Sequence, residues 1–253
     1  MRALLLIADI GGYTRFMTVH RINLTHAQQV VARLLEAIID AAKPFHLAKL
    51  EGDAAFFYWK LKDTPTPGEL DELPARVAAI RRAFLETRGD LDINRVCTCD
   101  GCVQAGQLTL KFVAHQGEVA VQKVKRHSEL AGVDVIFVHR LLKNSVPIRE
   151  YALMSEAVYE QLAEPLKSLA TPQKEHLEGL GEVDTRYVDL TAVEVGTIAV
   201  RPSRLRAWQS WLKTTWRSLP YFLGLKKPCE GFKNLGEVMP SALPAGTSPP
   251  PAR

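Results

Sequence analysis

The sequence lacks a long apolar run without charges, so no stretch of it is suited to cross a membrane as a helix. It also lacks a strong charge of either sign. Its 32 Lys and Arg oppose 28 Asp and Glu, and the net charge of +4 is too small to indicate nucleic-acid binding. The first residues do not show the basic, apolar and small-residue pattern of a leader. These absences predict a cytoplasmic protein that binds no nucleic acid.

Cysteine is scarce as well, with four residues in 253, too few for a disulfide scaffold at this length. Three of the four fall together at Cys97, Cys99 and Cys102. In a reducing compartment such a cluster indicates a second metal site, for zinc, or a redox site. The candidates for a fourth ligand are His115, His127 and Cys229. The alternative is an exposed loop with incidental thiols.

Apolar residues are abundant at 47%, against 24% charged, which fits one globular domain with a sizeable core plus extensions. The chain opens on an apolar run that stops at Asp9, after which Gly11 and Gly12 turn the backbone. This run is too short to span a membrane and predicts a buried strand. The strand would deliver a carboxylate to its C-terminal end.

A second carboxylate is expected close to the first. Gly52 and Asp53 separate two apolar runs at residues 45–51 and 54–60, which predicts a hairpin with Asp53 at its tip. If the hairpin neighbours the first strand, Asp9 and Asp53 can hold a divalent metal ion between them. The alternative for Asp53 is a tight turn without a ligand.

The remaining pattern completes an α+β domain. Apolar residues at helical spacing predict helices at 23–42, 73–88 and 132–143. Strands are predicted at 108–114 and 118–124, which would pair as a second hairpin, near 151–154, and in two segments within 176–190. This order predicts a ferredoxin-like mixed sheet with helices packed on one face.

The composition changes at about residue 196. The segment 196–235 is basic and rich in tryptophan, and it predicts an amphipathic helix with Leu205, Trp208, Leu212, Thr215 and Leu219 on one face. Such a helix can lie peripherally on an anionic membrane surface, or it can pack on the domain or on a dimer partner. The proline-rich tail predicts disorder. The expected division is 1–195, 196–235 and 236–253.

Four segments, in order, resemble the class III nucleotidyl cyclases. Residues 4–16 resemble the family's strand with aspartate, isoleucine and glycine, and residues 49–53 its lysine-x-x-glycine-aspartate hairpin. Residues 108–119 resemble its strand followed by a histidine-x-glycine turn, and residues 132–141 its helix ending in arginine-leucine. The resemblance extends over residues 4–190 and implies the same α+β fold.

The resemblance implies a metal-dependent reaction of a nucleoside triphosphate. Two Mg²⁺ or Mn²⁺ ions would lie between Asp9, Asp53 and the triphosphate, with the Ile10 carbonyl as a further ligand. One ion would activate the ribose 3′-hydroxyl for attack on the α-phosphorus, and the other would hold the triphosphate. Gly11 and Gly12 would let the backbone approach the phosphates.

The resemblance also implies which nucleotide base is bound and how two protomers assemble. Lys49 and Glu129 stand where adenylyl cyclases contact adenine, which favours ATP over GTP. Arg140 stands where an arginine stabilises charge in the transition state. Family members are usually head-to-tail homodimers with sites at the interface, so the two aspartates would come from one protomer and the other three residues from its partner. Outside such a site, Lys49, Glu129 and Arg140 would be ordinary surface charges.

Two positions depart from the family's pattern. Ile136 stands where the family has an asparagine that orients the ribose, and Leu180 where it has a lysine that grips the β- and γ-phosphates. Each loss costs roughly a hundredfold or more in rate. The candidates to replace the missing cation are Lys123, Lys125, Arg126 and Arg186.

Three functions therefore stay open. The first is an atypical adenylyl cyclase, weak or dependent on an activator, that converts ATP to cyclic AMP and pyrophosphate. The second is a catalytically inactive relative that serves as a nucleotide-sensing or scaffold dimer. The third is a metal or redox sensor built on the cysteine cluster, with a tail that touches a membrane.

Overall fold

The computed structural model describes residues 1–19, 24–94, 104–125, 127–164 and 166–193, with isolated residues between 196 and 225. Within these ranges no helix has both the length and the apolar character needed to cross a membrane. The three clustered cysteines, most of segment 196–235 and all of 236–253 lie outside the described residues. The expectations for those parts stay predictions.

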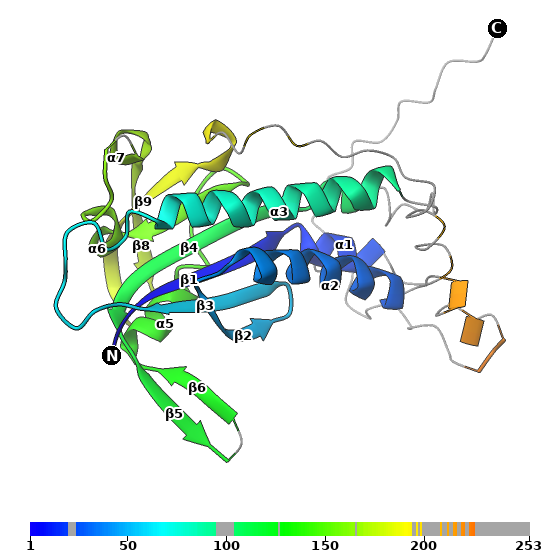
Figure 1. Ribbon diagram of the computed structural model, residues 1–253, viewed down its shortest axis with the longest axis horizontal. Helices are drawn as coiled ribbons and strands as arrows, with labels where there is room; N and C mark the ends of the chain where they lie inside the picture. The colour runs from blue at the N-terminus through cyan, green and yellow to red at the C-terminus, as the bar shows by residue number, and fades with distance from the viewer. Residues whose placement is uncertain are drawn as a thin grey trace, which may run out of the picture.

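In the described part of the chain, seven strands form one mixed sheet. They are β1 (Arg2–Gly11), β2 (His46–Glu51), β3 (Ala54–Lys60), β4 (Thr109–Glu118), β7 (Tyr151–Ser155), β8 (Thr171–Leu177) and β9 (Gly181–Asp189). Their order across the sheet is β2-β3-β1-β4-β7-β9-β8 (Figure 1). The β4–β7 pair is parallel and the other pairs are antiparallel. The predicted mixed sheet of the α+β class is confirmed.

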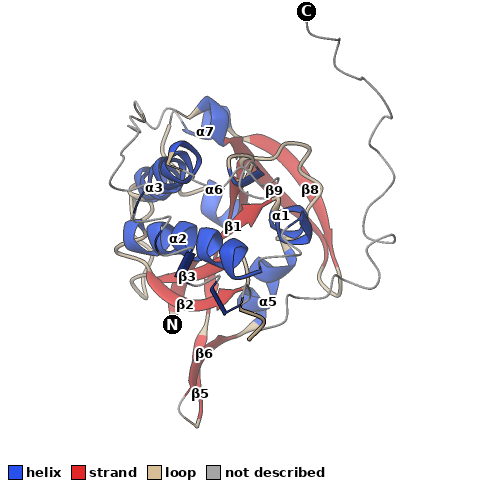
Figure 2. Ribbon diagram, turned by 90° about the vertical axis from the view of Figure 1, so that its right-hand side faces the viewer, coloured by secondary structure: helices blue, strands red, loops and turns tan. Residues whose placement is uncertain are grey.

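Helices pack on both faces of this sheet (Figure 2). They are α1 (Tyr13–Val19), α2 (Leu24–Ala41), α3 (Leu73–Ile93), α5 (Val133–Arg140), α6 (Glu156–Tyr159), α7 (Leu166–Leu169) and the 3₁₀ helix η1 (Leu190–Ala192). The long helices α2 and α3 lie side by side on one face (Figure 1). The shorter α5 packs on the opposite face, where helices were not expected.

The central strand β1 explains why both faces need a cover. Its side chains from Ala3 to Ala8 are fully buried. Leu4 and Leu6 belong to the apolar cluster under α2 and α3, while Leu5 and Ile7 belong to the cluster that includes α5. A strand in the middle of a doubly covered sheet reads as a continuous apolar run, as here, because neither side meets water.

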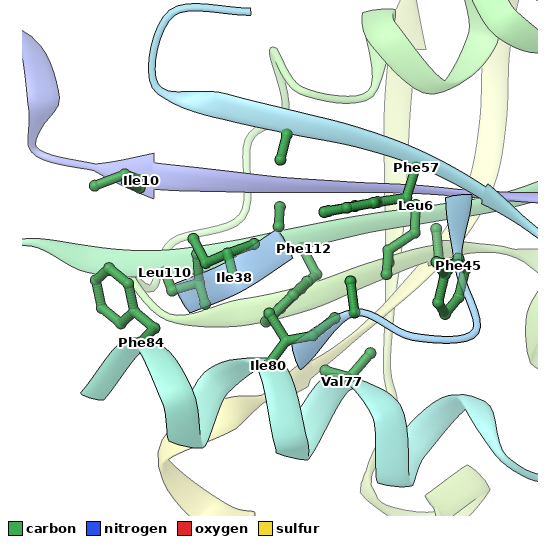
Figure 3. Close-up of a cluster of buried hydrophobic side chains, with 14 of the residues drawn as sticks. Leu6, Ile10, Ile38, Phe45, Phe57, Val77, Ile80, Phe84, Leu110 and Phe112 are labelled. Carbon is green, nitrogen blue, oxygen red and sulfur yellow. The ribbon is translucent and has the colours of Figure 1, made fainter. Parts of the chain in front are cut away.

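Packing of α3 follows from the spacing of its apolar residues. Figure 3 shows Val77, Ile80 and Phe84 of α3 directed toward the strands that carry Leu6 and Phe112. Burying each of these large apolar side chains contributes about 1.5–3 kcal/mol. The helix extends to Ile93, five residues beyond its predicted end at residue 88.

The predicted hairpin between residues 108–114 and 118–124 is wrong. Strand β4 continues through His115 and Gly117 to Glu118 and pairs with β1 over its whole length. The next strand, β5 (Ala120–Val124), pairs instead with β6 (His127–Ala131) as a separate hairpin that projects from the body (Figure 1). Gly117, expected in a turn, is a strand residue at a close contact.

That close contact involves Asp134 at the start of α5. A Cβ added at Gly117 would overlap the Asp134 carboxyl group. This carboxylate accepts hydrogen bonds from the Glu118 amide at 2.6 Å and from His115 Nε2 at 3.0 Å. The missing side chain at Gly117 therefore lets α5 attach to β4.

Gly117→Ala is expected to lower the free energy of unfolding by about 1–3 kcal/mol, because the added methyl group separates Asp134 from both of its donors. Urea unfolding followed by circular dichroism measures this. In the control Gly106→Ala, the added Cβ would lie 3.5 Å from Asp92 Cγ, an ordinary contact, so little change is expected. Equal losses in the two variants would contradict the role given to this contact.

Candidate functional site

Two carboxylates meet at the C-terminal end of β1. Asp9 lies near the end of that strand, in register with Lys111 of β4. Asp53 lies in the turn between β2 and β3, where Gly52 adopts a positive φ of 70°. The Asp53 carbonyl accepts a hydrogen bond from the Ile10 amide at 3.1 Å, which fixes the turn against β1. The structure therefore brings together the two carboxylates that the sequence singled out.

The two carboxylates repel each other, and the nearby Lys111 ammonium relieves this repulsion only in part. Burial and the nearby Asp9 carboxylate raise the pKa of Asp53 to about 6. On the other side of Asp9, the Lys111 ammonium lies 3.0 Å from Asp9 Oδ2. Burial lowers the pKa of Lys111, but the Asp9 carboxylate, together with Tyr151 and Asp53, raises it, and the net shift is upward. Added positive charge between the two aspartates would thus be stabilising.

The two carboxylates fit a hard divalent ion whose other ligands are phosphate oxygens and water. Mg²⁺ is commonly held by one or two protein carboxylates together with substrate phosphates and water. Asp9 and Asp53 supply such carboxylates. Among the described residues, no group of three or more His, Cys, Asp or Glu could enclose a metal ion by itself. Phosphate and water would have to complete the coordination.

The glycine pair after Asp9 is required by the local geometry. A Cβ added at Gly11 would overlap the hydroxyl of Thr109 on β4. Gly12 has a φ of +85°, a conformation that side chains rarely adopt. Its carbonyl accepts a hydrogen bond from the Phe16 amide at 3.0 Å, within the first turn of α1. The backbone after Ile10 therefore turns sharply and carries no side chain at Gly11 and Gly12.

The candidate base-binding residues also lie together. Lys49 of β2 and Glu129 of β6 approach to 3.9 Å between Nζ and Oε1. Their side chains are 54% and 64% exposed, so the ion pair contributes little to stability and both groups remain accessible to a ligand. The fold brings these two residues together although 80 positions separate them in the sequence.

Arg140 is the last residue of α5 and lies against the turn between β8 and β9. Its Nη1 atom is 3.0 Å from the position that a Cβ of Gly179 would take. The preceding residue, His139, donates from Nδ1 to the Val135 carbonyl at 2.7 Å and contacts the Glu51 carboxylate through Nε2 at 3.1 Å. Since Glu51 precedes the Gly52–Asp53 turn, α5 is tied to the same turn that carries the second carboxylate.

The structure offers no polar side chain at either of the two positions that depart from the family's pattern. Ile136 is 49% exposed on α5 and offers no hydrogen bond. Leu180 is partly buried and packs on the apolar cluster beneath α5. Neither position therefore supplies the polar contact that the family has there.

Of the candidates to replace the missing cation, Arg186 is already paired with a carboxylate. Arg186 is engaged by the Glu156 carboxylate at 3.1 Å and lies 4.0 Å from the centre of the Tyr159 ring. Lys123 and Lys125 lie on the exposed β5–β6 hairpin, and Arg126 lies outside the described residues.

Sequence reasoning missed a cavity of about 420 Å³ beside Lys111. Its walls are the Gly11–Gly12 turn, helix α1, the start of β4 and the segment between α5 and β7. The charged residues among its described lining are Arg15, Lys111 and Arg149, and none of the described lining residues is Asp or Glu. These segments are far apart in the sequence, and the one local signal is Lys111 itself, a polar residue between Leu110 and Phe112.

His115 has a structural role instead of a ligand role. It is buried, its Nε2 donates to Asp134 at 3.0 Å, and its Nδ1 lies 2.9 Å from the Ser155 hydroxyl. Burial lowers the pKa of this histidine, despite the nearby carboxylate. The neutral ring thus joins β4 to α5 and β7, and no ring nitrogen is left for a metal ion at the cysteine cluster.

Asp53→Asn is expected to stabilise the metal-free protein at pH 8 and to have a smaller effect at pH 5. The raised pKa means that the folded state disfavours the ionised carboxylate, so stability is lost as the pH rises through about 6. Urea unfolding in a chelator at the two pH values tests this, with the exposed Asp184→Asn as the control. Added Mn²⁺ should stabilise the parent protein at pH 8 and not Asp53→Asn. A pH-independent difference between parent and Asp53→Asn would contradict the assignment.

Comparison with solved structures gives class III cyclases at low sequence identity. The adenylyl cyclase CyaB from P. aeruginosa has a TM-score of 0.55 and 14% identity, over 80% of this chain and 96% of that chain. A class III adenylyl cyclase-like ATP-binding protein from Pseudomonas aeruginosa has a TM-score of 0.55 and 16% identity, over 67% of this chain and 36% of that chain. The chain therefore has the class III cyclase fold, and at these identities the likeness concerns the fold alone.

Sequence comparison gives a nearer relative. Residues 31–151 match the family model described as "Protein of unknown function (DUF2652)". Over 206 residues the chain is 46% identical to the "Uncharacterized protein Rv2561/Rv2562" of Mycobacterium tuberculosis, covering 81% of this chain and 95% of that protein. At this identity and coverage, the chain belongs to the same family as that mycobacterial protein.

Proposed function

We propose that this protein binds a nucleoside triphosphate together with Mg²⁺ or Mn²⁺ and converts it, slowly, to a cyclic nucleotide and pyrophosphate. ATP is the favoured substrate, giving cyclic AMP. The observation that carries the proposal is the meeting of Asp9 and Asp53 at the end of β1, in a chain with the class III cyclase fold. Their mutual repulsion, which contributes to the raised pKa of Asp53, suits metal ions bound to a triphosphate.

The residues have distinct tasks in this proposal. When bound, the metal ions lower the pKa of the ribose 3′-hydroxyl and neutralise charge on the triphosphate. Asp9 and Asp53 hold the ions, and the Ile10 carbonyl is a further candidate ligand. The 3′-oxygen then bonds to the α-phosphorus as the bond to pyrophosphate breaks, and the hydroxyl proton passes to solvent. Arg140 places a permanent positive charge where negative charge grows.

The preference for adenine rests on Lys49 and Glu129. An ammonium can donate to a ring nitrogen of adenine, and a carboxylate can accept from its exocyclic amino group. Guanine carries an oxygen acceptor where adenine carries this amino group, so a carboxylate there would repel it. The proximity of the two side chains and their exposure support this assignment.

We further propose a homodimer with the site at its interface. Asp9 and Asp53 would face Lys49, Glu129 and Arg140 of the other protomer. Exposed apolar residues on β2 and α5, such as Leu50 and Val133, support a partner surface on this side of the molecule. The extension after residue 196 could add a peripheral membrane contact to a cytoplasmic protein.

A second candidate is a nucleotide-binding dimer without turnover. Ile136 and Leu180 favour it, because neither can orient the ribose or neutralise the phosphates. The similar Pseudomonas aeruginosa structure is itself described as a cyclase-like ATP-binding protein, so this fold accommodates such a role. The third hypothesis, a sensor built on Cys97, Cys99 and Cys102, concerns residues outside those described and stays a prediction.

The test offers the purified full-length protein each of the four nucleoside triphosphates with Mn²⁺ and measures cyclic products by mass spectrometry. A cyclic product, at least about a hundredfold reduced in Asp9→Ala/Asp53→Ala, is the expected result. The matched control is Asp184→Ala, since this aspartate is exposed on β9. ATP binding without product would favour the second candidate, and binding of no nucleotide would overturn both.

Lys49→Glu is expected to lower the affinity for ATP by about tenfold or more, the value of a hydrogen bond from a charged donor. Calorimetric titration with a non-cyclisable ATP analogue measures the change. The control Lys174→Glu replaces a lysine that is also exposed and also loosely paired with a carboxylate. An unchanged affinity for ATP in Lys49→Glu would contradict the base-binding role.

A further inference from the structure

We propose that a second cavity, of about 60 Å³ between α3 and the sheet, binds a small neutral organic molecule, and that Arg81 donates a hydrogen bond to its carbonyl oxygen. The ligand class is a short alkyl ketone or ester. The inference does not depend on the proposed function, because this cavity and the two aspartates belong to opposite faces of the sheet.

The cavity lies on the face of the sheet that α2 and α3 cover. Its walls include Val77 of α3, Leu6 of β1 and Phe112 of β4, all labelled in Figure 3. Side chains alternate along a strand, so Asp9 points, as Leu5 does, toward the face that α5 covers. The sheet therefore separates this cavity from the carboxylate pair.

The walls of the cavity suit an apolar ligand. Arg81 carries the one polar side chain among the described lining residues. An ordered water molecule needs roughly two to four polar partners, whereas an organic carbonyl needs a single donor. The volume of about 60 Å³ is about twice the volume that one water molecule takes up in the liquid, so the cavity admits only a short alkyl group.

Arg81 offers an unpaired donor at this cavity. The residue is 8% exposed and lies on the same face of α3 as Val77 and Ala78, which also line the cavity. Its Nη1 donates to the Val193 carbonyl and its Nη2 to Glu150 Oε2, both at 3.2 Å. Its Nε is buried and has no hydrogen-bond partner among the residues that the structure describes. Buried donors are nearly always paired, so an acceptor oxygen beside Nε would be stabilising.

The charges around Arg81 favour a neutral ligand over an anion. Glu150 pairs with Arg81 and lies 3.6 Å from Arg88 Nη1, so this carboxylate serves two guanidinium groups. Burial lowers the pKa of Arg88, and Glu150 and Asp92 oppose that shift. Two acids therefore balance the two arginines. A ligand carboxylate would bring unbalanced negative charge into an apolar cavity, which is costly, whereas a carbonyl oxygen brings none.

Nuclear magnetic resonance of the full-length protein, labelled with ¹³C in its methionine methyl groups, tests this with butanone as the probe. Met154 lines the cavity, so its signal is expected to shift with butanone concentration until it saturates. Met17 packs on the same apolar cluster but is not among the described lining residues, so its signal should change little.

Two variants separate the shape of the cavity from its hydrogen bond. Ala78→Leu fills the cavity from α3 and should abolish the shift at Met154, whereas the control Ala79→Leu adds the same bulk at an exposed position of that helix and should bind as the parent does. Arg81→Lys keeps a positive charge beside Glu150 and removes Nε. It is expected to weaken butanone binding by about tenfold or more.

Two further probes have the size of butanone and a different polar group. The alkene with a methylene group in place of the butanone oxygen should bind equally to the parent and to Arg81→Lys, and propanoate should bind more weakly than butanone. A Met154 signal that does not shift, or that shifts equally in the parent and Ala78→Leu, would overturn the site. Equal losses of butanone and alkene binding in Arg81→Lys would overturn the role of Nε, and tighter binding of propanoate would overturn the neutral ligand class.

Discussion

The antiparallel pairing of β1 with β3 and β4 is the constraint on which the candidate site depends. Pairing with β3 places the turn that follows β2 against the end of β1, and so places Asp53 beside Asp9. Pairing with β4 places Lys111 on the other side of Asp9. A shift of one residue in either register would turn these side chains to the opposite face of the sheet. The apolar clusters on both faces of β1 oppose such a shift, because it would exchange their members.

Helix α5 is positioned by polar contacts as well as by its apolar side. At its start, Asp134 bonds to His115, and at its end His139 contacts Glu51 beside the second carboxylate. Arg140 follows directly. The helix that carries the candidate transition-state residue is thus fixed both to the central strand and to the turn that carries Asp53, although Val138 is the one residue within α5 that is buried.

The site combines features that favour binding with others that oppose fast chemistry. A paired aspartate site, an accessible Lys49–Glu129 pair and a positively charged cavity all suit a nucleotide with its metal ions. Ile136 withholds an oriented hydrogen bond, and a replacement for it would have to come from another part of the assembly. The residues proposed to bind a nucleotide and the position that fails to orient the ribose are therefore different ones.

The sequence by itself determined the α+β class, the first strand that carries Asp9, the hairpin with Asp53 at its tip and a helix over the segment that includes Arg140. Each depends on a local pattern: an apolar run, a Gly-Asp turn, or helical spacing. Only the tertiary structure decided that β4 continues past Gly117, that Lys111 faces Asp9, and that Arg149 joins them around one cavity. These features depend on which distant strands pair and in which register. Packing on both faces of the sheet decides the pairing and the register, and no local sequence pattern predicts that packing.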